Sequence, residues 1–433
     1  MEEKLYKKTI HAWCMYDWAN SAFATTIMAA LFPPFYRSLV IKAGFAENMA
    51  TAYWGYTTAT ALLMVALAAP ALGAISDHTG GKKRYVAFFA GLGILSTSSF
   101  VFIGPDAWLF ASHLFVIGNI GFAGANVFYE SLLPHLARLR DIDQISARGY
   151  ALGYLGGGFL LLLNVMWVMK PGMFGMPDKG FAVKASFVSV AVWWGLFSIP
   201  LFRRVPEPAT SKKTDSHPNP IRAGFSRLAE TCREISQYRQ LLIFLAAFWI
   251  YNDGIGTIIK MATAYGSEIG IGIIDMTIAL IITQFIGVPF SFLFGALAKR
   301  VGAKNSILMA LGVYFLISVG GYMMKTPRDF YALAMVVGMV QGGSQALSRS
   351  VYGAMVPKHK SAEFFGFFST TSKFAGIAGP LLFGIVSQLT GESRMSIACM
   401  VFFFVIGGFL LTRVDVEEGK RAARAAEKEG ARL

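Results

Sequence analysis

An acid lies in a stretch of the chain that is otherwise suited to lipid. Asp17 falls within YDWANSAFATTIMAALFPPFY (residues 16–36), and Asn20 follows three residues later, on the same face of a helix. An ionisable side chain at membrane depth costs at least about 2.5–3.5 kcal/mol unless it is paired or hydrated. Asp17 could therefore bind a substrate amine or a proton. The alternative is a carboxylate that anchors packing between two spans near the inner surface.

A second acid, Asp253, lies about 20 Å into its own apolar segment at helical rise. Asn252 precedes it and two glycines follow, and such glycines can loosen a helix and expose its backbone to a ligand. A cavity role is favoured here, because depth raises the cost of an idle charge. Lys373, deep in a later segment, could neutralise a substrate carboxylate or pair with Asp253. An acid and a base facing one cavity would suit a zwitterionic amino acid.

The remaining charges at membrane depth form two similar pairs. Glu130 can pair with Arg148, which opens the next apolar segment, and Arg349 with Glu363 repeats this layout with the signs exchanged. Each pair could lock the cytoplasmic end of its half of the chain, a structural role that competes with one in coupling. The candidates for substrate or proton binding are Asp17, Asn20, Tyr129, Glu130, Asn252, Asp253, Gln345, Arg349 and Lys373.

The elements that position these residues are transmembrane helices. Of the 433 residues, 55% are hydrophobic and only 15% are charged, and the mean hydropathy is +0.52. A soluble protein could not bury so much apolar surface. The sequence predicts an all-α membrane protein with twelve spanning segments, each long enough to cross a bilayer: 12–38, 50–76, 85–104, 107–136, 147–169, 182–202, 240–262, 271–299, 305–325, 329–355, 362–389 and 394–413.

The net charge of +14 is distributed by side rather than by domain. Lys and Arg gather in alternate loops, such as Lys82 to Arg84 and Lys358 to Lys360, which predicts that these loops and both termini are cytoplasmic. We therefore read the charge as orientation in a plasma (inner) membrane, and not as nucleic-acid binding. No cleavage site precedes the first segment, so we expect it to remain in the mature protein.

Four regions follow from this pattern. We expect a six-helix bundle at 1–203, a cytoplasmic linker at 204–239, a second six-helix bundle at 240–413 and a cytoplasmic tail at 414–433. The linker predicts an amphipathic helix on the inner leaflet, or else a solvated one, with one apolar face made of Phe225, Leu228, Ala229, Cys232 and Ile235. The tail is charged and rich in Ala, as expected of a soluble helix or a disordered segment.

The two bundles carry matching loops. GAISDHTGGKK (73–83) follows the second span and GALAKRVGAKN (295–305) follows the eighth, so that Gly73 aligns with Gly295 and Gly80 with Gly302. Two halves in the same order predict a pseudo-two-fold axis along the membrane normal and a binding site near the midplane between them.

The first of these loops has the composition of a gate. Glycines permit close helix approach and a tight turn, an acid can cap a helix or pair with a cation, and basic residues hold the loop at the anionic inner surface. A plain basic loop is the alternative. The candidate gating residues are Gly73, Asp77, Gly80, Lys82, Arg84, Arg148, Gly295, Gly302 and Glu363. The order Gly–Asp–Gly–basic resembles the signature of the major facilitator superfamily, whose members have twelve spans in two parallel halves.

Within that superfamily, several motifs resemble the unknown major facilitator family, which includes the autophagy-linked vacuolar effluxers. They are YDWANSAF with ALFPPFY in the first span, SARGYALGYLGGG (146–158), YNDGIGTI (251–258) and the stretch from 345 to 384. The resemblance implies transport, and its eukaryotic members are associated with amino-acid efflux from the vacuole. It gives little guidance on the substrate of bacterial members.

These observations predict a secondary transporter that works by alternating access, as a monomer in the bilayer and without a cofactor or enzymatic activity. Coupling to protons through Asp17, Glu130 or Asp253 is expected, with facilitated diffusion as the alternative. The GYLGGG run (153–158) lacks a nucleotide-loop context and is read as tight helix packing. The three cysteines and six histidines show no metal-ligand spacing. Rival readings are a multidrug or sugar proton antiporter and a non-transporting membrane sensor or enzyme.

Overall fold

The computed structural model describes residues 2–430 except 46, 209–234, 236, 269–270, 377 and 391–392. For some helical residues it describes the backbone alone, and Asp77 and Lys373 are among them. The roles expected for these two side chains, and the amphipathic helix expected in the linker, therefore lie outside the described residues.

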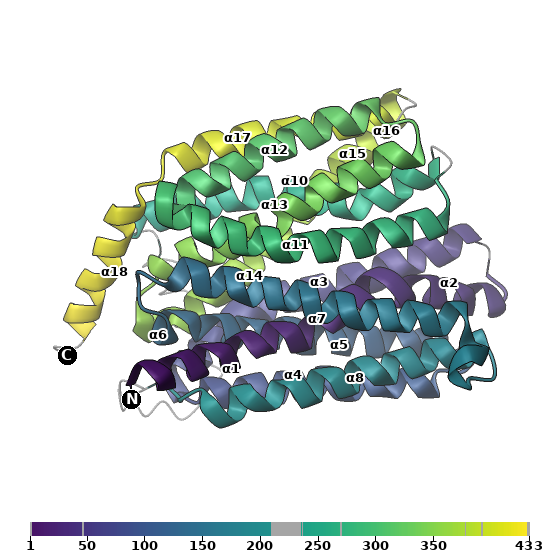
Figure 1. Ribbon diagram of the computed structural model, residues 1–433, viewed down its shortest axis with the longest axis horizontal. Helices are drawn as coiled ribbons and strands as arrows, with labels where there is room; N and C mark the ends of the chain where they lie inside the picture. The colour runs from purple at the N-terminus through teal and green to yellow at the C-terminus, as the bar shows by residue number, and fades with distance from the viewer. Residues whose placement is uncertain are drawn as a thin grey trace. The chain divides into compact units, whose positions relative to one another are not determined.

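The described chain is helical throughout, and each of the twelve predicted segments coincides with helical structure (Figure 1). Ten helices are long and apolar enough to cross a membrane, and a shorter apolar stretch, Tyr53–Ala69, lies within α3. The first half contains α1 (Glu2–Ala22), η1 (Phe23–Leu31), α2 (Phe32–Lys42), α3 (Glu47–Thr79), α4 (Lys82–Ser99), η2 (Phe100–Phe102), α5 (Trp108–Ser131), α6 (Leu133–Leu136), α7 (Ile142–Met169), η3 (Pro171–Phe174) and α8 (Lys179–Arg204).

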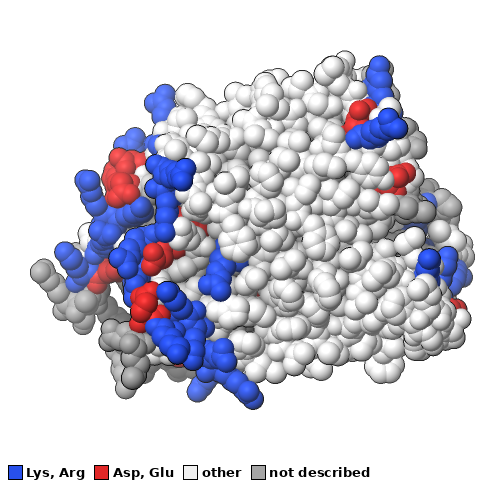
Figure 2. All heavy atoms as spheres, in the orientation of Figure 1, with Lys and Arg blue, Asp and Glu red and all other residues white. Residues whose placement is uncertain are grey.

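The second half repeats this pattern of long helices. It contains α10 (Arg239–Glu268), α11 (Ile273–Val301), α12 (Ala303–Met323), α13 (Pro327–Ala354), η4 (Lys358–Lys360), α14 (Ser361–Phe374), α15 (Ala378–Thr390), α16 (Ser393–Cys399), α17 (Val401–Thr412) and α18 (Val416–Gly430). Figure 2 shows that, on the face in view, charged side chains gather mostly near helix ends and leave a broad uncharged band between them. The chain is a multi-pass integral membrane protein of the all-α class.

The chain divides into two compact units that do not follow the sequence halves. Unit 1 comprises Met1–Ala68, Gly81–Tyr129 and Leu152–Glu207. Unit 2 comprises Ala69–Gly80, Glu130–Ala151 and Pro208–Leu433. The ends of α3, α5 and α7 that flank the basic loops thus pack with the second half, although the sequence places them in the first.

The first span is one continuous helix whose middle section is wider than an α-helix. Residues Phe23–Leu31 form a π-helix between α1 and α2. Pro33 and Pro34 follow at once in the first turn of α2 and cannot donate hydrogen bonds to the preceding turn. Widened turns of this kind occur where the regular ladder is interrupted, and they are frequent at functional sites.

Each half uses a lysine to cap the last helix of its bundle. Lys83 Nζ donates to the carbonyls of Phe202 (2.9 Å) and Val205 (2.6 Å) at the end of α8. Lys304 Nζ donates to Val414 O (2.9 Å), beyond the end of α17. A cation at a helix C-terminus satisfies free carbonyls and complements the helix dipole.

This likeness corrects the alignment of the repeats by one residue. Gly81 (φ +79°) precedes α4 as Gly302 (φ +88°) precedes α12, and in both halves the capping lysine lies two residues further on. The structural counterpart of Gly302 is therefore Gly81, not Gly80. The mismatch arises because the first loop has one extra residue, and Gly80 (φ +71°) takes up the added turn.

Replacing Lys304 by Met should lower stability by about 1 kcal/mol, because the aliphatic stem remains while the carbonyls beyond α17 lose their donor. The thermal unfolding midpoint of the purified protein in detergent measures this. Lys299→Met, at the exposed end of α11, is the matched control and should leave the midpoint unchanged. Equal midpoints for both variants would contradict the capping role.

Candidate functional site

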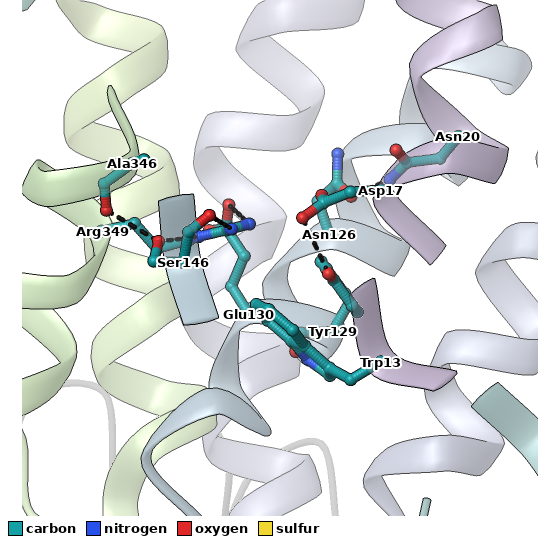
Figure 3. Close-up of polar contacts among 9 residues, drawn as sticks. All are labelled: Trp13, Asp17, Asn20, Asn126, Tyr129, Glu130, Ser146, Ala346 and Arg349. Atoms are coloured by element: carbon teal, nitrogen blue, oxygen red, sulfur yellow. Dashed lines mark hydrogen bonds and ion pairs between the residues drawn. The ribbon is translucent and has the colours of Figure 1, made fainter. Parts of the chain in front are cut away.

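A polar cluster in unit 1 joins α1 to α5. The Tyr129 hydroxyl donates to Asp17 Oδ2 at 2.9 Å, and Asn20 Nδ2 donates to Asn126 Oδ1 at 2.6 Å (Figure 3). Trp13 Nε1 donates to the Tyr129 carbonyl at 3.1 Å. The predicted pair Asp17 and Asn20 therefore shares one helix face, and the structure brings it together with Tyr129.

Local packing fixes the donor that faces Asp17. The Tyr129 ring stacks on Trp13 at 4.6 Å and packs against Tyr16 at 4.7 Å, and all three side chains are fully buried. Asp17 itself is only half-buried. A rigid phenol thus holds a partly accessible carboxylate within an apolar helix. A carboxylate can accept several hydrogen bonds, and the Tyr129 hydroxyl supplies one of them.

The glycine run of α7 lets that helix approach α1 closely. A Cβ on Gly153 would lie 2.6 Å from Ser21 Oγ, and one on Gly156 would lie 2.6 Å from Trp18 O. Thr25, in the widened section of the first span, donates to Gly157 O at 3.2 Å. The GYLGGG run is confirmed as a packing surface, and it sets the backbone position of α1 beside Asp17.

Gly156→Ala should therefore cost about 1–3 kcal/mol, because the added methyl group overlaps the Trp18 backbone and ring. Gly195→Ala is the matched control, since a Cβ there meets only Ile94 at 3.8 Å. Both variants are compared by thermal midpoint in detergent. A Gly156→Ala midpoint as high as that of Gly195→Ala would show that α1 can shift without cost.

A second polar cluster, in unit 2, is centred on Arg349 of α13. Its guanidinium is 1% exposed. Nε donates to Ser146 Oγ (2.9 Å), Nη2 donates to Ser146 O (3.0 Å), and Nη1 lies 4.0 Å from Glu130 Oε1 (Figure 3). The Tyr150 ring lies 4.5 Å from the guanidinium carbon. These contacts favour a structural role for Arg349 in linking helices, and its role in substrate or proton binding stays a prediction.

Further contacts in unit 2 join the same helices. Ser146 Oγ donates to Ala346 O (2.7 Å), and Ser350 Oγ donates to Asp143 Oδ1 (2.6 Å). These bonds connect α7, from the first repeat, to α13, from the second. Sequence reasoning missed Asp143, Ser146 and Ser350, although Asp143, Ser146 and Tyr150 recur at i, i+3 and i+7 on one face of α7.

Glu130 forms an ion pair with Arg349, which joins the two repeats. The pairing of Glu130 with Arg148 and of Arg349 with Glu363, expected from sequence, stays a prediction. Arg148 is half-buried on α7, and Glu363 is 4% exposed in the first turn of α14. Both make contacts of their own, and their gating roles remain predictions.

The repeated glycines Gly73 and Gly295 mark close helix approaches in unit 2. A Cβ on Gly73 would overlap Ala362 O and lie 2.7 Å from the Glu363 Cα, and one on Gly295 would lie 2.8 Å from Ala147 Cβ. The second span thus packs on the start of α14, and the eighth packs on the start of α7. Gly73 and Gly295 therefore lie at tight helix contacts, and their gating role stays a prediction.

The basic residues of the first loop behave differently from the expectation that all of them hold the inner membrane surface. Lys82 is only 5% exposed, and Lys83 is engaged at the end of α8. Arg84 alone of the three is exposed.

The C-terminal helix α18 and the residue before it bond to α10 and to η4, both in unit 2. The Asp415 N–H donates to Gln240 Oε1 (2.8 Å), and Gln240 Nε2 donates to Glu418 Oε2 (2.5 Å). The Lys358 N–H donates to Glu427 Oε1 (3.1 Å). The tail is thus a helix docked on the second bundle, as one of the two sequence alternatives proposed.

The remaining candidates lie on α10 and α13. Asp253 is 1% exposed and accepts the Gly379 N–H through Oδ2 at 2.9 Å. Its neighbour Asn252 is half-buried, as is Gln345 on α13. Asp253, in the middle of α10, thus bonds to the first turn of another helix, α15.

Comparisons with known proteins agree on one family. A family model described as "Vacuole effluxer Atg22 like" matches residues 6–424. An uncharacterised MFS-type transporter of Bacillus subtilis, YxiO, is 39% identical over 415 residues, with 96% of each chain covered. Autophagy-related protein 22 of Eremothecium gossypii is 27% identical, with 78% of this chain and 72% of its own length covered.

Solved structures show the same fold at low sequence identity. The proton:xylose symporter XylE superposes with a TM-score of 0.73 at 14% identity, covering 95% of this chain and 96% of its own. A bacterial homologue of the iron transporter ferroportin gives a TM-score of 0.63 at 11% identity, covering 94% and 98%. These similarities establish the major facilitator fold of the chain.

Proposed function

Because the chain belongs to the Atg22-like family of effluxers within the major facilitator superfamily, we propose that it exports or exchanges a small zwitterionic amino acid, coupled to protons. The transport function follows from the family, and the substrate and coupling ion are the proposal. Asp17 supports it most directly. Its carboxylate is half-buried in an apolar span, and the fixed Tyr129 hydroxyl orients it.

This geometry suits an ammonium group. A carboxylate in a low-dielectric setting binds a primary amine by a charge-assisted hydrogen bond, while the Tyr129 hydroxyl occupies one of its oxygens. Asn20, bonded to Asn126, presents further polar atoms on the same face. Arg349 is committed to Ser146 and Glu130, so the proposal does not use it to bind the substrate carboxylate.

The proposed setting is a plasma (inner) membrane, with both termini in the cytoplasm and a monomeric transporter. The excess of Lys and Arg in the loops at one side supports this orientation. Arg84, exposed at the start of α4, is a suitable site for a single cysteine whose labelling from each side reports the topology.

Counterflow into proteoliposomes tests the function. Vesicles loaded with one amino acid at a time should take up the same labelled amino acid, and an imposed pH gradient should alter its net flux. Xylose, a hydrophobic cation and vesicles without protein are the comparison arms. Saturable counterflow of an amino acid supports the proposal. Counterflow of the sugar or the hydrophobic cation alone would overturn it in favour of a sugar or multidrug antiporter.

A further inference from the structure

The eleventh span is broken in its middle. Helix α14 ends at Phe374 and α15 begins at Ala378, within the sequence SKFAGIAGP (372–380). Two glycines lower the helix propensity there, and Pro380 removes a backbone donor. Inside a bilayer, backbone groups released by such a break must find partners in the protein. Broken helices of transporters commonly lie beside bound ions or substrates.

One partner at this break is a buried acid. Asp253, on α10, accepts the backbone N–H of Gly379 at 2.9 Å, in the first turn of α15. Its side chain is 1% exposed. A negative charge at a helix start is stabilised by the free N–H groups and the helix dipole. Asp253 is therefore placed to hold the start of α15.

The buried hydroxyl of Thr257 also lies against Gly379. Thr257 lies one turn after Asp253 on α10 and is fully buried, and its Oγ1 has no hydrogen-bond partner among the described residues. A Cβ on Gly379 would overlap Thr257 Oγ1 and lie 2.8 Å from Asp253 Oδ1. Both oxygens therefore border one small space that only a glycine leaves open. A buried hydroxyl without a partner requires an explanation, because such groups are nearly always hydrogen-bonded.

We propose that Asp253 is the site that binds the coupled proton, with Thr257 as the acceptor for the carboxyl hydrogen. Hydronium gives its proton to Asp253 Oδ1 and leaves as water, and the new O–H donates to Thr257 Oγ1. On release, the proton returns to water and the carboxylate is restored. This role presupposes the transport function proposed above and names the group that couples it to protons.

Protonation at this position changes the helix contact directly. The ionised carboxylate holds the Gly379 N–H through a charge-assisted bond, and a neutral carboxyl group holds it about half as strongly. The break in span eleven is thereby loosened when the proton is bound and tightened when it leaves. A proton can thus shift the balance between two arrangements of α15.

The described contacts of this part of α10 include uncharged groups of α13 and α17. The Tyr251 hydroxyl is bonded to Ser348 of α13 at 2.7 Å, and Phe403 and Phe404 of α17 face Gly254. Lys373 of α14 is the nearby charged residue in sequence, and its side chain lies outside the described part.

The test uses the full-length protein in proteoliposomes that contain a pH-sensitive dye. Wild-type protein should move protons together with the amino acid found by counterflow. Asp253→Asn should lose proton movement and pH-driven accumulation by at least about tenfold, while slower counterflow remains. Thr257→Val, which keeps the shape, should move the pH midpoint of coupling to lower pH by about 0.5–1 unit, because the neutral carboxyl group loses its acceptor.

Thr283→Val is the matched control, because Thr283 of α11 is also buried and its hydroxyl bonds to Ala279 O within its own helix. It should leave coupling and its midpoint unchanged. Proton movement retained in Asp253→Asn would overturn the inference, as would an unshifted midpoint in Thr257→Val. Amino-acid counterflow without proton movement in the wild-type protein would overturn the proton-site inference but not the proposed function. The absence of counterflow with every amino acid would overturn the proposed function. If Asp253→Asn does not fold, the Thr257→Val midpoint decides.

Discussion

Asp17→Asn is expected to reduce amino-acid counterflow about 100-fold, which corresponds to about 2.8 kcal/mol at 1.4 kcal/mol per factor of ten. The substitution keeps the size of the side chain and a partner for the Tyr129 hydroxyl, but it removes the charge that would hold a substrate ammonium. Because the side chain is half-buried and its hydrogen bond can be kept, the protein should still fold. Initial counterflow rates, normalised to reconstituted protein, measure the effect.

A second acid held by a tyrosine provides the control. Asp275, in the first turn of α11, accepts from the Tyr331 hydroxyl at 2.5 Å and has the same chemistry at a span end. Asp275→Asn should retain counterflow within about twofold. Tyr129→Phe should fall between the two variants, since Asp17 keeps its charge and loses its orienting donor. Wild-type counterflow in Asp17→Asn would remove this residue from the transport mechanism.

Arg349→Met is expected to give the largest loss of stability, about 3–5 kcal/mol. The guanidinium is buried and satisfies both the hydroxyl and the carbonyl of Ser146, and it neutralises Glu130. Removing it leaves the buried Ser146 groups without their donor and takes the Arg349 cation from the partly buried Glu130 carboxylate, and breaking such a pair costs more than the pair itself contributes. Arg349→Lys should recover little, because an ammonium cannot reproduce the planar fork. Thermal midpoints in detergent give the order of the variants.

A double substitution separates charge from packing. Arg349→Met combined with Glu130→Gln should be more stable than Arg349→Met alone, because the uncompensated charge is gone. Arg413→Met, where the guanidinium lies exposed over Phe409, is the control and should change the midpoint little. Additive losses in the double variant would show that Glu130 and Arg349 do not interact.

The helices could be predicted from sequence because lipid imposes a simple condition on them. All twelve apolar segments fall on helical structure, and the tail after residue 414 also forms one of the elements considered for it. Hydropathy did not reveal where a span departs from the α-helix. The widened turn at Phe23–Leu31 and the break after Phe374 both lie in apolar stretches, and only the nearby prolines and glycines signalled them.

The sequence singled out candidate residues, but it did not indicate which side chains contact one another. Asp17, Tyr129, Glu130, Asp253 and Arg349 stood out because charge and polarity are costly in lipid. Which group meets which depends on how helices far apart in sequence pack, and sequence spacing does not report that packing. Arg349 reaches Ser146 and Glu130, which lie about 200 residues away in sequence. Serine hydroxyls were overlooked, since an isolated serine in a span gives no signal of its own.

The docked α18 has a practical consequence for anyone who purifies this protein. A histidine tag or a fluorescent protein fused after Leu433 would be attached next to α18, whose Glu427 side chain accepts the Lys358 N–H. Binding such a handle to resin, or letting a bulky fusion tumble beside the bundle, would pull on that contact in every assay. The beginning of α1 is mostly exposed. The handle therefore belongs at the amino end, and rates measured with the two placements would reveal how tightly the tail restrains the cycle.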